Sequence, residues 1–243
     1  MTLPATARAN LNHVNEPAAS AKALRIEVYS DLICPWCYIG KRRMEDGLAL
    51  LGEGATWDVI WRPFELNRDM PKEGMDRKTY RSRKFGGWER SLAMDRDVTA
   101  NGAAAGVEFN FAKIDRTPNT FLGHRLLWLA QKEGTQNKLN DALLRAYFTD
   151  GRDIGDPETL VMIAEENGMN PQSVAAFLAS EEGAKEVRDE EQHAHQLGLT
   201  GVPFLIVNGV PAFSGAQLPA HFAEVFRSAL GAVANCGGPA CSA

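Results

Sequence analysis

The hydrophobic positions change their period along the chain in an order that predicts an α/β fold. Residues 24–30 alternate as in a strand, a helical pattern opens at Tyr38 and runs to about Gly52, and residues 56–64 again have strand character. Strand, helix and strand in this order predict a βαβ unit at the start of the domain.

The middle of the chain has helical spacing throughout. The pattern predicts helices within 79–105, 120–133, 138–148, 157–167, 171–180 and 181–197. Two of these helices should start at Asp156-Pro157 and Asn170-Pro171, because each pair combines a capping side chain with a first-turn proline.

Strand character returns only near the end of the chain, at residues 202–207. Asn208-Gly209 predicts a hairpin turn into a returning strand at 210–213, and a last helix is expected over 218–230. A βαβ opening and a ββα close therefore flank a helical block.

Composition and charge exclude several classes of function. The 243 residues are 44% hydrophobic, enough for a sizeable core, and the net charge of −5 offers no footprint for nucleic acid or an anionic membrane surface. The densest basic run, residues 77–84, is expected to be a solvated face. No stretch has the length of a membrane span or the pattern of a secretory signal, so we expect no membrane partner and a cytoplasmic location.

The chemistry-bearing motif is Cys34-Pro35-Trp36-Cys37, which lies where the first strand ends and the first helix begins. The N-terminus of a helix favours a thiolate, and the thiolate is the species that attacks disulfides. Cys34 at the helix start can therefore act as nucleophile, and Cys37 one turn inward can resolve the mixed disulfide.

Two segments together resemble a known family. Residues 30–40 (SDLICPWCYIG), followed by residues 200–204 (TGVPF) and Asn208-Gly209, are similar to the DsbA-like thioredoxin superfamily and most closely to its FrnE-like thiol–disulfide oxidoreductase subgroup. The resemblance covers residues 24 to about 230. It implies an α/β fold in which a thioredoxin-like domain carries an inserted all-helical domain.

The resemblance also implies roles for individual residues. Cys34 would be the attacking and Cys37 the resolving catalytic cysteine, and Trp36, Val202 and Pro203 would form the substrate-binding surface. Taken alone, Pro203 fits equally a cis peptide bond or the start of an edge strand, and the family pattern favours the cis bond. Trp36 stands where exported oxidising relatives carry histidine, so the resemblance leaves the reduction potential open. The lack of a secretory-signal pattern favours a cytosolic exchanger.

We expect four parts along the chain. They are a flexible N-terminal extension (1–23), the thioredoxin-like domain (24–64 and 186–230), the inserted helical domain (65–185) and a C-terminal tail (231–243). The tail contains Cys236 and Cys241, which are either an auxiliary redox pair that exchanges with the first pair or incidental. Asp31 either tunes the active site or caps the helix start.

The predicted function is a thiol–disulfide oxidoreductase or isomerase acting on thiol- or disulfide-containing protein substrates, with a role in redox homeostasis or oxidative stress. Glutathione or a thioredoxin-type reductant is the candidate electron partner. No cofactor and no metal are expected.

Three alternatives stay open. The four cysteines could bind structural zinc. The chain could be a glutathione-dependent transferase or isomerase of the kappa or hydroxychromene carboxylate isomerase type, although those relatives place serine where this chain has Cys34. It could also be a chaperone, but we expect the large aromatic residues of the insert to form its own core, and His124 to be packed there. These aromatic residues are Phe109, Phe111, Phe121, Trp128 and Phe148.

Overall fold

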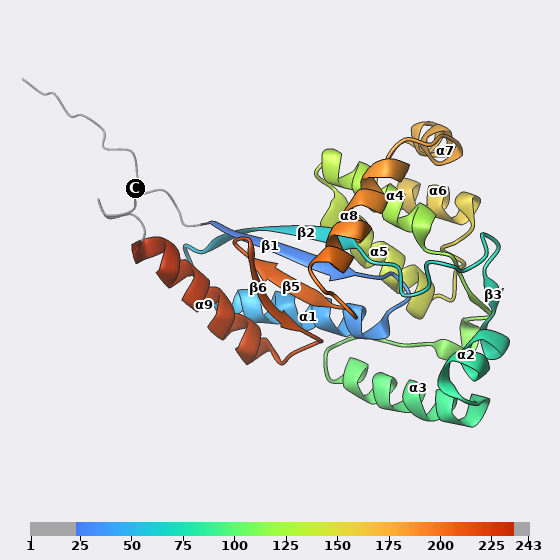
Figure 1. Ribbon diagram of the computed structural model, residues 1–243, viewed down its shortest axis with the longest axis horizontal. Helices are drawn as coiled ribbons and strands as arrows, with labels where there is room; N and C mark the ends of the chain where they lie inside the picture. The colour runs from blue at the N-terminus through green and yellow to red at the C-terminus, as the bar shows by residue number, and fades with distance from the viewer. Residues whose placement is uncertain (1–22, 236–243) are drawn as a thin grey trace, which may run out of the picture.

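A four-stranded mixed sheet forms the centre of the protein, in a computed structural model that describes residues 23–235 (Figure 1). Its strands, in the order β2-β1-β5-β6, are β1 (Ala23–Ser30), β2 (Thr56–Pro63), β5 (Phe204–Val207) and β6 (Val210–Ser214). Helix α1 (Pro35–Ala49) links the parallel strands β1 and β2, whereas β5 and β6 are antiparallel to their neighbours. The predicted α/β class and βαβ opening are confirmed. The N-terminal extension, except Ala23, and the Cys236 and Cys241 pair lie outside the described residues.

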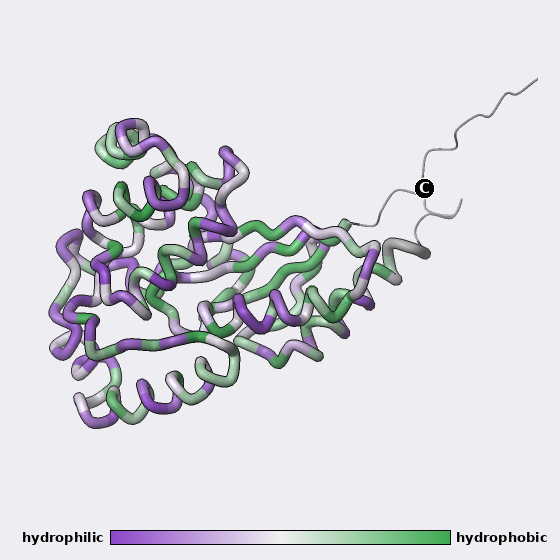
Figure 2. The backbone as a smooth tube through the Cα atoms, turned by 180° about the vertical axis from the view of Figure 1, so that it is seen from behind, coloured by the Kyte–Doolittle hydropathy of each residue, from purple (hydrophilic) through white to green (hydrophobic). Residues whose placement is uncertain are grey.

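The two faces of the sheet are covered by different helices. Leu24, Ile26 and Val28 of β1 pack against α1 and the last helix, α9 (Pro219–Asn235). Tyr29 points to the other face, where it packs with Ala194 of α8 (Ala184–Gln196). Strand alternation produces this division, and each large apolar side chain buried in this way contributes about 1.5–3 kcal/mol. The strands are accordingly rich in hydrophobic residues (Figure 2).

Helices dominate the chain between β2 and β5. They are α2 (Arg77–Phe85), α3 (Trp88–Ala103), α4 (Phe121–Lys132), α5 (Gln136–Phe148), α6 (Pro157–Glu166), α7 (Pro171–Ala179) and α8. The side chains of Asp156 and Asn170 cap α6 and α7 as predicted. A short 3-10 helix (Phe111–Lys113) and a two-stranded sheet of β3 (Met75–Asp76) with β4 (Arg116–Thr117) were not predicted.

Several predicted boundaries were wrong. The helical region expected over 79–105 is two helices, because Gly86 and Gly87 adopt φ of 78° and 131°, which only glycine takes up at little cost. The first helix ends at Ala49 rather than near Gly52, and α8 begins at Ala184 rather than at 181. The hairpin turn is confirmed, with positive φ at both Asn208 and Gly209.

The basic run 77–84 is not the solvated face that its composition suggested. Lys78, Arg83 and Lys84 are exposed, but Arg77 is buried and its Nη2 donates to Asp95 Oδ2 at 2.6 Å. Arg81 Nη2 donates to the other oxygen of the same carboxylate at 2.7 Å. The acidic partner comes from the next helix, which the charge pattern of the run cannot show.

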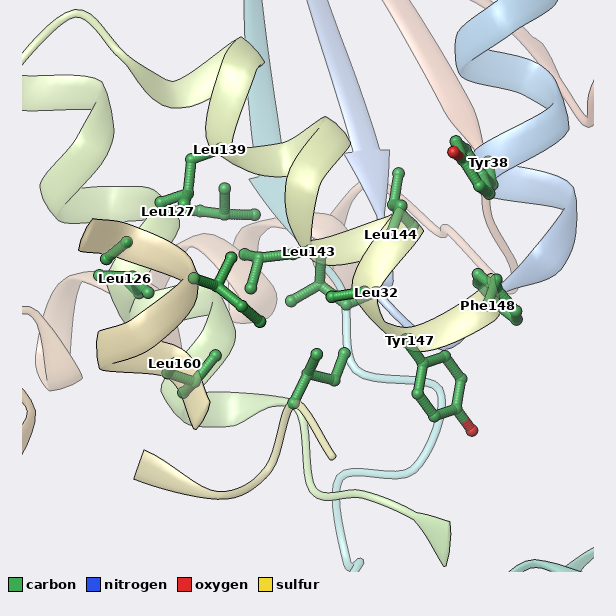
Figure 3. Packing of buried hydrophobic residues seen from close by; sticks show 14 of the residues in the cluster. Leu32, Tyr38, Leu126, Leu127, Leu139, Leu143, Leu144, Tyr147, Phe148 and Leu160 are labelled. Carbon is green, nitrogen blue, oxygen red and sulfur yellow. The ribbon is translucent and has the colours of Figure 1, made fainter. Parts of the chain in front are cut away.

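A continuous hydrophobic core joins the insert helices to the segment before the cysteines. Leu32, two residues ahead of Cys34, lies among leucines of α4 and α5, and Tyr38 of α1 lies beside Phe148 (Figure 3). Phe109 and Phe148 are buried in this core, and the half-buried Phe111 and Trp128 pack against it, as predicted. Phe121 is half-buried outside this core and lies beneath the Arg188 guanidinium. The boundaries of the insert at 65 and 185 stay a prediction.

Helix α5 is also fastened to the free edge of β2. The Gln136 side chain accepts from the backbone N–H of Trp61 and donates to its carbonyl, each at 2.9 Å. This amide pairs with the strand as a neighbouring strand would, and it fixes the helical part against the sheet.

Candidate active site

Cys34 occupies the N-cap position of α1. Its backbone is extended, with φ −90° and ψ 110°, Pro35 follows in the first turn, and the Cys37 N–H donates to the Cys34 carbonyl at 3.0 Å. No side chain caps the first N–H groups of this helix. The partial positive charge of the helix start therefore lies at Cys34.

Cys37 is fully buried beneath the helix start. Burial raises the pKa of the Cys37 thiol well above its usual range, and the hydrogen bond and charge of Cys34 raise it further. The Ser30 hydroxyl and the Asp31 backbone act in the opposite direction. Among the described residues both cysteines are free thiols. Cys34 keeps 5% of its surface exposed and Cys37 none, so Cys34 is the outer and Cys37 the inner position of one site.

The loop before β5 completes the site on the sheet side. The Val202–Pro203 peptide bond is cis, as predicted, and Cys34 Sγ lies 3.6 Å from the Val202 carbonyl oxygen. Gly40 lets α1 approach this loop, because a Cβ at that position would lie 3.1 Å from Pro203 Cγ. Trp36 is on the outer surface, with 38% of its area exposed. The fold thus brings Cys34, Cys37, Val202 and Pro203 together.

Asp31 does not cap the helix, which was one of its two predicted roles. It is completely buried, its Oδ2 accepts from the Leu66 N–H at 2.7 Å, and its Oδ1 lies 3.4 Å from His124 Nε2. His124 reaches it because Gly123 lets α4 approach closely: a Cβ there would lie 2.5 Å from Leu32 Cδ1. His124 is packed as predicted, but its partner on the active-site segment was missed.

Further charged side chains gather behind this pair. We call the following five residues the carboxylate cluster: Asp31, Glu65, His124, Arg188 and Glu191. Arg188 Nη1 donates to Glu65 and, at 2.8 Å, to Glu191 Oε2, and the Glu65 N–H donates to Glu191 Oε1 at 3.1 Å. Glu65 Oε1 is buried and has no hydrogen-bond partner among the described residues.

Burial and neighbouring charge shift the proton affinities in the carboxylate cluster. Burial, together with the negative charge of Glu191, raises the pKa of Glu65 to about 7, against the opposing effect of His124 and Arg188. Burial alone would lower the pKa of His124, but its hydrogen bond to Asp31 and the surrounding carboxylates raise it above its ordinary value. Glu65 and His124 therefore bind protons more tightly than isolated side chains would.

Comparison with known proteins agrees with this geometry. The family model of the DSBA-like thioredoxin domain matches residues 25–227. The chain belongs to the DsbA-like thioredoxin family. The more specific FrnE-like assignment stays a prediction.

Individual relatives of this DsbA-like protein span most of its length. It is 28% identical over 198 residues to the uncharacterised protein YwbO of Bacillus subtilis strain 168, covering 80% of this chain and 93% of the relative. A probable DsbA oxidoreductase from Streptomyces coelicolor is 37% identical, with a TM-score of 0.78 over 86% of this chain and 90% of the other. The cytosolic disulfide reductase DsbM of Pseudomonas aeruginosa, in a structure with GSH, has the same fold at 14% identity, with a TM-score of 0.60 over 85% and 98% of the two chains.

Residues 23–235 of the DsbA-like protein contain neither a membrane-spanning helix nor a metal-binding cluster. No helix there is long and apolar enough to cross a membrane. No group of three or more histidine, cysteine or acidic side chains there is arranged to hold a metal ion. The zinc hypothesis involves Cys236 and Cys241, which lie outside this range.

Proposed function

We propose that this DsbA-like oxidoreductase exchanges disulfides with protein substrates through Cys34 and Cys37. One observation carries the proposal: Cys34 Sγ lies at an uncapped helix start and 3.6 Å from the Val202 carbonyl, with the buried Cys37 thiol hydrogen-bonded to it from below. The outer sulfur is placed to meet a substrate, and the inner sulfur can meet only Cys34.

The two sulfurs then have successive roles. The Cys34 thiolate attacks one sulfur of a substrate disulfide and forms a mixed disulfide with it, while the other substrate sulfur leaves as a thiolate that takes up a proton. Cys37 then loses its proton and attacks Cys34 Sγ. This step releases the substrate sulfur that Cys34 had bound, again as a thiolate, and leaves a Cys34–Cys37 disulfide. The substrate gains two electrons and two protons, and the cysteine pair loses them; the reverse sequence oxidises a dithiol.

The surface around Cys34 suits an extended peptide. The Val202 backbone can pair with a substrate segment as a neighbouring strand would, and the exposed Trp36 ring can cover apolar side chains next to the substrate sulfur. Val202, Pro203 and Trp36 therefore keep their proposed role in substrate binding.

Asp31 is the residue that we propose tunes this pair. Its carboxylate lies behind the active site with His124, and its backbone carbonyl accepts from the Cys34 N–H at 3.1 Å. Because it acts through these contacts, Asp31→Asn should change the pH dependence of Cys34 alkylation. A purely structural role would leave that pH profile in place.

The electron partner and cellular setting are the finer parts of the proposal. Glutathione is a candidate because a structural neighbour carries it, and a thioredoxin-type reductant is the other. We further propose a cytoplasmic role in redox homeostasis or oxidative stress, with isomerase activity and relay through Cys236 and Cys241 as hypotheses. Equilibration with glutathione buffers would set the direction of transfer, since 30 mV corresponds to about 1.4 kcal/mol.

Trapping of the mixed disulfide tests the central step. Cys37→Ser should accumulate a covalent adduct with disulfide-containing insulin, because no Cys37 thiol remains to displace the substrate. Mass spectrometry detects this adduct. Cys34→Ser is the matched control and should form no adduct. Absence of the adduct, under conditions in which the unmodified protein turns over, would contradict the proposal.

The same variants distinguish disulfide exchange from the alternative function as a glutathione transferase. That chemistry needs a hydroxyl or thiol at position 34 but no second sulfur. Insulin reduction that persists in Cys34→Ser would favour the transferase reaction over disulfide exchange.

A further inference from the structure

A second cleft lies in the helical part of the protein, away from the cysteines. It is bounded by α2, α3 and the segment 107–115, which run together below the sheet in Figure 1, and its volume is about 870 Å³. Small-molecule sites typically have volumes of roughly 300–1,000 Å³. Neither Cys34 nor Cys37 lines this cleft.

The walls of the cleft are largely aromatic. Phe109 and Phe111 stack at 5.2 Å between ring centroids, and Trp88 of α3 also lines the cleft. Phe109 in turn packs edge-on against Tyr38 of α1, at 6.0 Å. The aromatic layer therefore separates the cleft from the catalytic helix and offers a surface on which a flat ring can stack.

A buried arginine lies between two of these rings. The guanidinium carbon of Arg77 is 5.6 Å from the centroid of Trp88 and 5.3 Å from that of Phe111. Its Nη2 is bound to Asp95, and 7% of the Arg77 side chain remains exposed where it lines the cleft. The rings hold the guanidinium in one place, and its remaining N–H groups can donate to a ligand.

The charge around this arginine is not balanced. Arg77 and Arg81 share the single carboxylate of Asp95, and we call these three residues the arginine triad. The charged side chains that line the cleft balance in number, with Arg77, Lys78 and Arg96 against Asp76, Asp95 and Asp115. Arg81 does not line the cleft, but because it shares Asp95 with Arg77, the arginine triad as a whole carries one positive charge next to the apolar wall.

We infer that this cleft binds a small aromatic carboxylate, with its ring on Trp88 and Phe111 and its carboxylate on Arg77. A single negative charge balances the arginine triad, and the guanidinium fork matches the geometry of a carboxylate. Arg77 also ties α2 to α3 through Asp95, but that structural role would not require an open aromatic cleft beside it.

Calorimetric titration with two matched probes tests the inference. The full chain should bind 2-naphthoate at least tenfold more tightly than 2-naphthamide, which has the same ring system and no charge. Arg77→Gln should weaken 2-naphthoate binding at least tenfold and 2-naphthamide binding less than threefold, because Asp95 keeps Arg81 as a partner. Arg145→Gln, at an exposed arginine of α5, is the charge-matched control and should change neither.

A blocking variant keeps the test decisive if Arg77→Gln does not fold. Ala100→Trp introduces a large ring into the cleft from an exposed position on α3 and should abolish binding of both probes without altering the unfolding curve. Equal affinity for the two probes, an equal loss in Arg145→Gln, or undisturbed binding in Ala100→Trp would overturn the inference.

Discussion

The protein has two groups of buried and half-buried charged side chains, and they leave opposite charges unbalanced. The arginine triad joins α2 to α3 and has two cations for one carboxylate. The carboxylate cluster behind the cysteines has three carboxylates, one arginine and one histidine. One group has a surplus of positive charge, and the other has a surplus of negative charge.

The two surpluses can be relieved only in different ways. Arginine does not release its proton under physiological conditions, so the triad is balanced only by an anion from outside. Carboxylates and histidine take up protons: the pKa of Glu65 is raised to about 7, and the pKa of His124 is raised above its ordinary value. The difference teaches that a buried positive surplus points to a ligand, whereas a buried negative surplus points to proton binding.

The largest expected effect comes from removing the shared carboxylate of the arginine triad. Asp95→Asn leaves the buried Arg77 and the half-buried Arg81 without a compensating charge, which should lower the free energy of unfolding by about 4 kcal/mol. Urea unfolding at pH 7 measures it. Asp97→Asn, at an exposed position of the same helix, is the control, and equal losses in both variants would remove the distinction.

Neutralising a carboxylate in the carboxylate cluster should raise the free energy of unfolding rather than lower it. The folded-state pKa of Glu65 is raised from 4.5 to about 7, so its contribution to stability falls as the pH rises between those values and stays low above them. Glu65→Gln should therefore be about as stable as the unmodified protein near pH 4.5 and more stable by about 3 kcal/mol at pH 8.

Unfolding curves measured across that pH range check the difference. The exposed Glu53 provides the control, and Glu53→Gln should follow the unmodified protein at every pH. A Glu65→Gln variant that is destabilised at pH 8 would show that the ionised carboxylate is needed where it lies.

A smaller effect of known sign is expected at His124. Its folded-state pKa lies above the unfolded value of 6.5, so its stabilising contribution is complete below pH 6.5 and is lost as the pH rises through the folded-state value. His124→Gln can still donate to Asp31 but carries no charge. It should lose about 1 kcal/mol of stability at pH 5.5 and less at pH 8.5. A loss that is the same at both pH values would mean that His124 contributes packing alone.

The sequence predicted those parts of the site whose signals are local. The strand end, the cysteine motif and the helix start are consecutive, so residues 24–37 are sufficient to place Cys34 at an N-cap. The hairpin turn and two helix caps were predicted for the same reason. In each case the residues that determine the geometry are neighbours in the chain.

The buried charged partners could not be predicted in this way. Asp31 and His124 are 93 residues apart, and only the packing of α4 brings them together. One signal was available but was missed: Glu191 falls on the same helical stripe as the buried Val187 and Ala194, which places a carboxylate on an apolar face. Its partner Arg188 could be identified by spacing, but Glu65 could not.

The smallest effect on stability is expected for a carboxylate that is not buried, which tests whether burial causes the larger effects. Asp189 lies two residues from Glu191 on α8 and pairs with Lys185 one turn away, but both side chains are mostly exposed. Water and salt screen this pair, and holding two long side chains together costs entropy. Asp189→Asn should therefore leave the unfolding curve unchanged at pH 6 and at pH 8. If it shifted the curve as Asp95→Asn does, the carboxylate charge itself, rather than its burial, would govern stability, and the contrast between the two groups would lose its basis.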